Sequence, residues 1–276
     1  MNDTTFEKQL EEMQIKDTMN SIKHKIMVMS NKGGVGKSSV ASNIAVELAN
    51  QGNKIGLLDI DIHGPSQAKI FNLTKKKLMS DEKGNIIPFE PIKNLKLVTI
   101  AGLLSDESQP TIWRGPLKIN IIKQFIINVV WKDLDYLIID APPGTGDEPL
   151  TIAQIIPNLD GIIIVTTPQS LALLDSKKAI SFAEKLKVNI LGIIENMSYL
   201  HCPHCSKKID LFKSHDDKSI FNEMKIKILG TLPFDAQLLE SMDNGNFFMK
   251  TNKQTALYQI MQSIVNQIKT LIEKKR

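Results

Sequence analysis

The 276-residue sequence lacks several features that mark other classes of protein. No apolar run approaches the roughly 20 residues that a membrane-spanning helix needs. The first 20 residues are polar, without the basic start and the apolar stretch of a signal peptide. The 34 basic residues are nearly balanced by 30 acidic ones scattered along the chain, which provides no strong field for nucleic acid. We therefore expect a cytoplasmic protein that binds neither nucleic acid nor a membrane.

Hydrophobic residues make up 42% of the sequence, which is enough for one large core. Apolar, β-branched runs alternate along the chain with segments of helical periodicity. Continuous apolar strands are typical of a parallel sheet that is covered on both faces. The pattern predicts an α/β fold with a doubly wound, mostly parallel sheet and right-handed crossovers. The expected strands are residues 25–30, 54–59, 95–100, 134–140, 160–166, 188–195 and 225–229, and the expected helices are residues 38–50, 115–130, 171–186 and 256–272.

A glycine-rich segment, Lys32–Ser38, joins the end of the first expected strand to the start of the first helix. Its glycines allow successive backbone N–H groups to point at phosphate oxygens, beside the positive end of the helix. Lys37 is expected to neutralise the β- and γ-phosphates, and the Ser38 hydroxyl to bind Mg²⁺. Asn31 stands where the usual P-loop has glycine, and asparagine tolerates unusual backbone angles. A glycine turn without a ligand is the plainer interpretation, but the lysine, the serine and two acidic motifs downstream favour a P-loop.

Two further strands end in carboxylates. Asp59 closes the second strand and Asp61 follows it, while Asp140 closes the fourth and leads into a loop rich in proline and glycine. A carboxylate at the carboxyl end of a buried strand beside a P-loop can hold a Mg²⁺-bound water. We therefore predict Mg²⁺ ligands at Ser38, Asp59, Asp61 and Asp140. For Asp59 and Asp61 the alternative is that acidic residues are common at strand ends and turns.

Two more segments, TIWRGPLKINIIKQF at residues 111–125 and IIENMSYLHCPHC at residues 193–205, follow in the sequence. With the motifs above, they resemble the Mrp family of ATP-binding iron–sulfur cluster carriers. That family belongs to the deviant-Walker-A class, which includes the iron protein of nitrogenase and the positioning ATPases MinD and ParA. The resemblance extends from Ile26 to Asp235, with the motifs in the family's order. The segment LFKSHDDKSIFNEMK, residues 211–225, departs from the family pattern.

The resemblance implies roles for individual residues. Lys32 would reach across a homodimer to the nucleotide of the other subunit, where a cation supplied in trans stabilises charge on the transferring phosphoryl group. An exposed loop lysine is the alternative. Asn196 would read the adenine edge, because an amide offers both a donor and an acceptor. The implied nucleotide-binding residues are Asn31, Lys32, Gly33, Gly34, Val35, Gly36, Lys37, Ser38, Ser39, Asn196, Pro233 and Asp235, and the implied catalytic residues are Lys32, Lys37 and Asp61.

The chain has only two cysteines, Cys202 and Cys205, in a Cys-x-x-Cys spacing. In a reducing cytoplasm two thiols are not expected to form a structural disulfide. Two thiolates can hold one side of a metal centre, whereas a closed zinc or iron–sulfur site usually has four ligands. The homodimer implied by the resemblance would supply four thiolates to one [4Fe–4S] cluster. Zinc held within one chain by the cysteines with His201 or His204, and a thiol oxidoreductase, are the alternatives.

The sequence thus predicts an N-terminal helical extension, residues 1–24, and a P-loop ATPase domain, residues 25–276, with the cysteine loop near residues 198–210. As the resemblance implies, the predicted protein is a homodimeric ATP hydrolase that uses ATP and Mg²⁺ and carries a [4Fe–4S] cluster to apo iron–sulfur proteins. A positioning ATPase like MinD or ParA, whose cysteines bind zinc or have no function, is the alternative. The apolar stripe of the last helix, followed by Lys274–Arg276, could then lie on an anionic membrane. Packing of that helix on the sheet explains the same stripe and is favoured.

Overall fold

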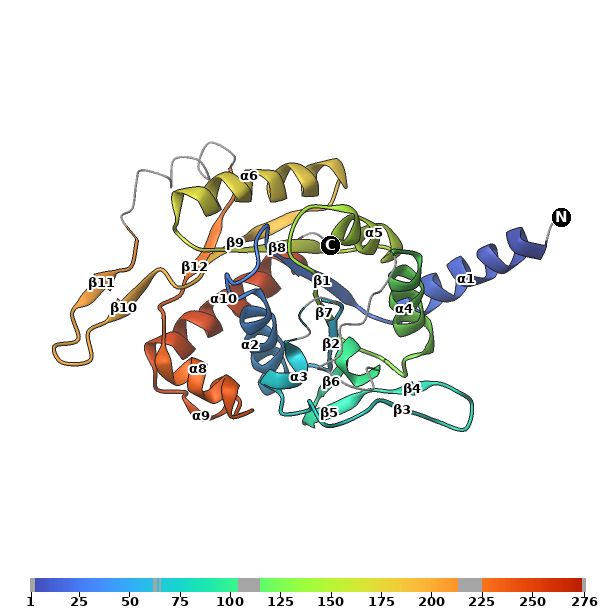
Figure 1. The fold of residues 1–276 in the computed structure, drawn as a ribbon, viewed down its shortest axis with the longest axis horizontal. Helices are drawn as coiled ribbons and strands as arrows, with labels where there is room; N and C mark the ends of the chain where they lie inside the picture. The colour runs from blue at the N-terminus through green and yellow to red at the C-terminus, as the bar shows by residue number, and fades with distance from the viewer. Residues whose placement is uncertain (1–2, 62–63, 65, 104–114, 213–224, 275–276) are drawn as a thin grey trace.

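The computed structural model describes residues 3–61, 64, 66–103, 115–212 and 225–274. Its centre is an eight-stranded sheet in the order β12-β9-β8-β1-β7-β2-β6-β5 (Figure 1). All neighbouring strands are parallel except β5 and β6, which are antiparallel. The predicted doubly wound, mostly parallel sheet is confirmed. Its strands are β1 (His24–Met29), β2 (Ile55–Asp59), β5 (Phe89–Ile92), β6 (Leu95–Thr99), β7 (Tyr136–Asp140), β8 (Gly161–Thr166), β9 (Ile190–Glu195) and β12 (Ile228–Thr231).

Helices cover both faces of the sheet because successive strand residues point to opposite sides. In β1, Ile26 and Val28 pack into one core, and Met27 and Met29 pack into the other. On the first side lie α2 (Lys37–Asn50), α3 (Gln67–Ile70), α8 (Ala236–Asp243), α9 (Phe248–Thr251) and α10 (Ala256–Glu273). On the second lie α1 (Asp3–Asn20), α4 (Gly115–Asn128), α5 (Asp147–Ile155) and α6 (Ser170–Lys185) (Figure 1).

The two terminal helices are fixed in different ways. The apolar stripe of α10 is buried against α2 and β12, so the expected packing on the sheet is confirmed. Helix α1 packs on α4 through Ile15 and Met19, which lie in the second core. The Lys25 ammonium donates to the carbonyls of Met19 and Ile22, both at 3.1 Å, at the C-terminal end of α1. A cation at this end of a helix is favourable, and it joins the extension to β1.

Several elements were not predicted from hydrophobic periodicity. They include the 3-10 helix η1 (Ile100–Leu103), the short helices α3, α8 and α9, the helix α5, and the antiparallel edge strand β5. Two hairpins were also missed, β3 (Met79–Ser80) with β4 (Ile86–Ile87), and β10 (Tyr199–His201) with β11 (Lys208–Asp210). Short elements have too few residues to show a period.

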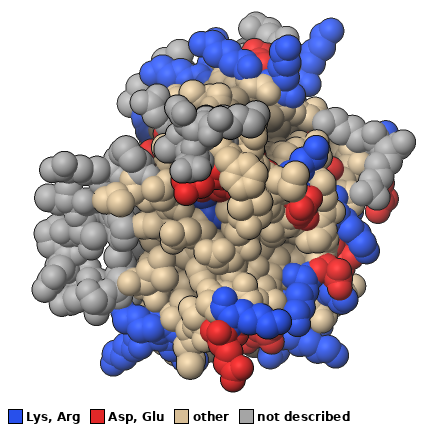
Figure 2. All heavy atoms as spheres, turned by 90° about the vertical axis from the view of Figure 1, so that its right-hand side faces the viewer, with Lys and Arg blue, Asp and Glu red and all other residues tan. Residues whose placement is uncertain are grey.

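On the face of the molecule that carries the N-terminal end, basic and acidic side chains are interspersed around the rim (Figure 2). None of the helices in the described ranges is both long enough and apolar enough to cross a membrane. Residues 111–114, at the start of the segment TIWRGPLKINIIKQF, lie outside the described residues. So do residues 213–224, which belong to the segment that departs from the family pattern.

Candidate nucleotide site and cysteine hairpin

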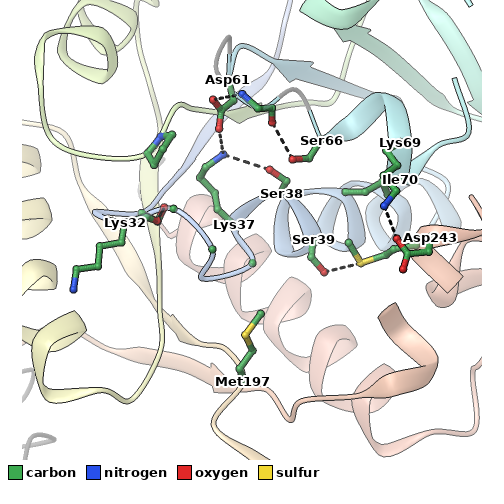
Figure 3. A pocket seen from close by; sticks show the side chains of 17 residues that line it. Lys32, Lys37, Ser38, Ser39, Asp61, Ser66, Lys69, Ile70, Met197 and Asp243 are labelled. Atoms are coloured by element: carbon green, nitrogen blue, oxygen red, sulfur yellow. Dashed lines mark hydrogen bonds and ion pairs between the residues drawn. The ribbon is translucent and has the colours of Figure 1, made fainter. Parts of the chain in front are cut away.

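The predicted P-loop connects the carboxyl end of β1 to the first residue of α2, Lys37. Gly34 and Gly36 both have positive φ values, of 79° and 84°, which L side chains rarely adopt. The loop curls around one side of a cavity of about 530 Å³ (Figure 3). The cavity wall is completed by α3, α8 and the residue after Asn196, and its lining includes Ser30, Lys32, Gly33, Gly34, Gly36, Lys37, Ser38, Ser39, Asp61, Ser66, Lys69, Pro143, Met197, Met242 and Asp243.

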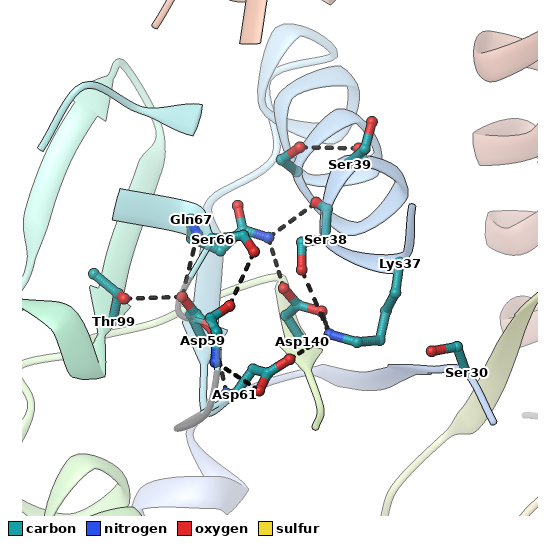
Figure 4. Close-up of polar contacts among 12 residues, drawn as sticks. Ser30, Lys37, Ser38, Ser39, Asp59, Asp61, Ser66, Gln67, Thr99 and Asp140 are labelled. Carbon is teal, nitrogen blue, oxygen red and sulfur yellow. Dashed lines mark hydrogen bonds and ion pairs between the residues drawn. The ribbon is translucent and has the colours of Figure 1, made fainter. Parts of the chain in front are cut away.

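The predicted carboxylates meet around the Lys37 side chain, and of the three only Asp61 lines the cavity. Asp59 and Asp140 are register partners at the ends of the neighbouring parallel strands β2 and β7. The ammonium of Lys37 lies 2.5 Å from Asp140 Oδ1 and 3.6 Å from Asp61 Oδ2 (Figure 4). It also lies 3.5 Å from the Ser38 hydroxyl. The fold therefore gathers the lysine, the serine and the three acids that the sequence singles out.

The pKa of Asp59 is raised in this cluster. Its side chain is fully buried, and burial together with the nearby Asp140 raises its pKa to about 8, although a hydrogen bond from Thr99 and the charge of Lys37 oppose the shift. The Asp59 carboxyl therefore tends to keep its proton near neutral pH. A divalent cation in this cluster would favour the ionised form, because its charge outweighs the repulsion from Asp140.

Gln67, the first residue of α3, belongs to this cluster although the sequence analysis missed it. Its Nε2 donates to Asp140 Oδ2 at 2.8 Å and to the Ser38 carbonyl at 2.9 Å, and its backbone N–H donates to Asp59 Oδ2 (Figure 4). Its Oε1 is buried without a hydrogen-bond partner. The carboxylates of Asp59, Asp61 and Asp140 and the hydroxyl of Ser38 are oxygen ligands of the kind that Mg²⁺ prefers, and they lie around the Lys37 ammonium. By its chemistry this donor set suits Mg²⁺.

Of the remaining residues predicted to bind the nucleotide, only some line the cavity. Lys32 is half-buried on the cavity wall, and its side chain extends away from Lys37 (Figure 3). The Asn196 amide donates to the carbonyl of Val35 at 2.9 Å, so it contacts the back of the P-loop. The Ser39 hydroxyl lies 3.1 Å from Met242 Sδ on the cavity wall.

Three further predicted residues lie at the edges of this region. Asp235 caps α8 by accepting hydrogen bonds from the backbone N–H groups of Gln237 and Leu238. Pro233 is buried, two residues before this cap. Asn31 is half-buried at the start of the P-loop. Neither Pro233 nor Asp235 lines the cavity.

The two cysteines lie in the turn of the β10–β11 hairpin, which extends from the body at the left of Figure 1. Both thiols are free. The backbone N–H groups of His204 and Cys205, together with the Cys205 thiol, lower the pKa of the Cys202 thiol. The turn is closed by a hydrogen bond from Ser206 N to the Cys202 carbonyl at 2.8 Å, with Ser206 at a φ of 56°. Amide groups directed at a sulfur stabilise the thiolate that binds metal.

The hairpin provides two thiols, and among the described residues no third His, Cys, Asp or Glu side chain completes a metal site with them. Nδ1 of His201 lies 3.1 Å from the Ser206 carbonyl. That ring also contacts Tyr199 edge to face, with the ring centroids 5.4 Å apart.

The sequence model of the NUBPL iron-transfer P-loop NTPases, in the ParA group, matches residues 21–269. The chain belongs to this family. Membership in the NUBPL iron-transfer P-loop NTPases confirms the resemblance to ATP-binding iron–sulfur carriers that the motifs indicate.

Curated relatives and solved structures agree with this assignment. The iron-sulfur cluster carrier protein of Methanocaldococcus jannaschii is 46% identical over 235 residues, which cover 85% of this chain and 81% of the relative. The cytosolic Fe-S cluster assembly factor NUBP2 homolog of Dictyostelium discoideum is 43% identical over 252 residues, which cover 90% and 95%. A nucleotide-binding protein of Archaeoglobus fulgidus in complex with ADP is 38% identical, with a TM-score of 0.75 over 86% of this chain and 92% of that one.

The cell division ATPase MinD of Pyrococcus furiosus has a TM-score of 0.64 over 90% of this chain and 99% of its own. It is only 19% identical, so it shows that the fold is shared and nothing about function. The predicted fold of a deviant-Walker-A P-loop ATPase is confirmed.

Proposed function

We propose that this protein is an ATP-dependent iron–sulfur cluster carrier, which binds a [4Fe–4S] cluster between two copies of the chain and transfers it to apo iron–sulfur proteins. The observation that carries the proposal is the two-thiol turn of the β10–β11 hairpin, in which Cys202 and Cys205 are both free. The names of the curated relatives, an iron-sulfur cluster carrier and a cytosolic Fe-S cluster assembly factor, support the same cargo.

The nucleotide site would hydrolyse ATP in this proposal. The P-loop amides and Lys37 would bind the phosphates, and Lys37 would exchange its present carboxylate partners for phosphate oxygens. Ser38, Asp59, Asp61 and Asp140 would hold Mg²⁺, which supplies charge neutralisation at the transferring phosphoryl group when it is bound. Lys32 would act on the nucleotide of the other subunit, because its side chain extends away from the phosphate cluster of its own chain. The adenine role of Asn196, Pro233 and Asp235 stays a prediction.

The cysteines and the nucleotide are connected by a short path. Asn196, which contacts the P-loop, precedes Cys202 by only five intervening residues. A change in the P-loop on nucleotide binding would therefore reach the hairpin through residues 197–198 and β10. This connection supports a carrier in which the nucleotide state affects how the cluster is held.

The test is anaerobic purification, reconstitution with iron and sulfide, and an absorption spectrum with iron, sulfide and zinc analysis. We expect a brown protein with about two irons and two sulfides per chain, since a [4Fe–4S] cluster would be shared by two chains. ATP hydrolysis would be measured on the same sample. A colourless protein with one zinc per chain would refute the carrier proposal and support the positioning ATPase with a zinc site.

A further inference from the structure

Gln67 contacts one oxygen of each of the two buried carboxylates that close β2 and β7. Its Nε2 donates to Asp140 Oδ2 at 2.8 Å, and its backbone N–H donates to Asp59 Oδ2 at 3.3 Å (Figure 4). The same Nε2 donates to the Ser38 carbonyl at 2.9 Å. Because a carboxylate oxygen and a carbonyl oxygen are both acceptors, the amide nitrogen and not the amide oxygen must face them. Gln67 is therefore a fixed donor to the acidic cluster.

The two oxygens of Asp140 have different partners. Oδ1 lies 2.5 Å from the Lys37 ammonium, and Oδ2 accepts the hydrogen bond from Gln67. In the proposed ATPase, Lys37 exchanges Asp140 for phosphate oxygens, which leaves Oδ1 available to a cation. Oδ2 stays with Gln67, because nothing in that exchange removes its donor. Asp140 can then offer a metal one oxygen and not two.

The rest of α3 and the residue after it fix the position of Gln67. Gln67 itself is fully buried, and Ile70 and Phe71 pack into the first core. The backbone N–H of Phe71 donates to the Gln67 carbonyl at 3.0 Å. An ion pair of 2.7 Å between Lys69 and Asp243 joins α3 to α8. An amide that is anchored in this way resists rotation of the carboxylate that it holds.

Mg²⁺ and Ca²⁺ differ in what they require of a carboxylate. Mg²⁺ is small, demands nearly octahedral geometry and keeps several of its waters. Ca²⁺ takes about six to eight oxygens in a flexible arrangement, and it often binds a carboxylate through both oxygens. A carboxylate that is restricted to one oxygen therefore suits Mg²⁺ and deprives Ca²⁺ of a ligand. Groups that hydrogen-bond to a metal ligand typically change metal affinity by about 10–100-fold.

We infer that Gln67 makes the metal site selective for Mg²⁺ over Ca²⁺, because it keeps one oxygen of Asp140 from binding the metal. This inference rests on the proposed function, since it concerns the metal that the ATP site would bind. Gln67 is then a positioning residue, which acts on the metal through Asp140 and is not itself a ligand. The alternative is a role in stability alone, because the same hydrogen bonds join α3 to β7 and α2.

The test compares the metal preference of the wild-type protein with that of Gln67→Met, which keeps the length of the side chain but has no N–H donor. Gln267→Met is the matched control, because it removes an equivalent donor, to the Leu229 carbonyl at 2.9 Å, from the β12 edge of the sheet.

Metal binding is measured on full-length protein saturated with ADP. Mn²⁺ is bound first, and Mg²⁺ or Ca²⁺ is then titrated in while the electron paramagnetic resonance signal of the released Mn²⁺ is followed. The two titrations give the ratio of the Mg²⁺ and Ca²⁺ affinities for each variant. Thermal unfolding checks that each variant is folded, and Gln67→Asn, whose amide is one methylene too short, replaces Gln67→Met if that variant does not fold.

We expect the ratio of Mg²⁺ to Ca²⁺ affinity to fall by roughly tenfold or more in Gln67→Met, because Asp140 loses the partner that restricts it to one oxygen. Gln267→Met should keep the wild-type ratio. An unchanged ratio in Gln67→Met, including equal losses of both affinities, or an equal fall in Gln267→Met, would overturn the inference and leave the proposed ATP site intact. A wild-type ADP complex that binds neither Mn²⁺ nor Mg²⁺ would instead refute the ATP site of the proposed function.

Discussion

Gly36 is the P-loop position at which the structure most clearly leaves no room for a side chain. A Cβ built there would lie 2.2 Å from Asn196 Nδ2, and the residue has a φ of 84°. For an L-residue the left-handed backbone costs about 1–2 kcal/mol. Moving Asn196 would leave the buried Val35 carbonyl without its donor, which costs about 1–3 kcal/mol. We therefore predict that Gly36→Ala destabilises the nucleotide-free protein by about 2–5 kcal/mol in total, if the two costs add.

Two matched controls separate these costs. Gly34→Ala has the same type of backbone angle, with a φ of 79°, but its Cβ would meet nothing within 4 Å. It should lose only the backbone contribution of about 1–2 kcal/mol. In an Asn196→Ala background, Gly36→Ala should likewise lose only the backbone contribution, because the obstructing amide is absent.

The assay is urea unfolding of all four variants together with calorimetric titration of ADP. The two substitutions at Gly36 and Asn196 should show a coupling free energy of about 1 kcal/mol or more, as neighbours in contact do. ADP affinity should fall most in Gly36→Ala, since the loop amides that bind phosphate would be displaced. Equal losses for Gly34→Ala and Gly36→Ala, or no coupling with Asn196, would refute the reasoning that Asn196 supports the loop.

Four further predictions concern the chemistry of the two sites. Lys37→Ala should abolish ATP turnover, because the phosphates lose their fixed cation; wild-type turnover would remove the P-loop assignment. Lys32→Ala should bind ATP but hydrolyse it slowly, and mixing it with Lys37→Ala should restore part of the activity in mixed dimers, whereas no recovery would argue against action in trans. Gln67→Leu should reduce hydrolysis by roughly tenfold or more with little loss of ADP binding, since it removes the donor to Asp140 while keeping the side-chain size; an unchanged rate would show that Gln67 is only structural. Cys202→Ser should abolish cluster binding and leave ATP hydrolysis largely intact, and a half-loaded cluster in reconstituted protein would contradict a site bridged by two chains.

The sequence by itself determined the sheet and the phosphate end of the site. Long apolar runs have few alternatives to buried strands, and a glycine-rich turn between a strand and a helix has a strong local signature. The carboxyl ends of parallel strands share one edge of a sheet, so acids that close two such strands must approach the loop that leaves a third. Asp59 and Asp140 are therefore register partners beside Lys37, as their places at the ends of strands indicated.

Only the tertiary structure decided what surrounds the side chains of Lys37, Asp59 and Asp140, and which side chains the β10–β11 hairpin exposes. Gln67 reaches Asp140 because α3 folds back over the end of β2, a contact between residues 73 positions apart that no local pattern encodes. Asn196 likewise contacts Val35, although 161 positions separate the two residues in the sequence. The segment around the cysteines is too short for its periodicity to be read, and the pairing of Leu200 with Ile209 depends on the register of the hairpin. A shift of that register by one residue would reverse the two sides of the hairpin, so the side on which Ile209 is exposed follows from strand pairing and not from composition.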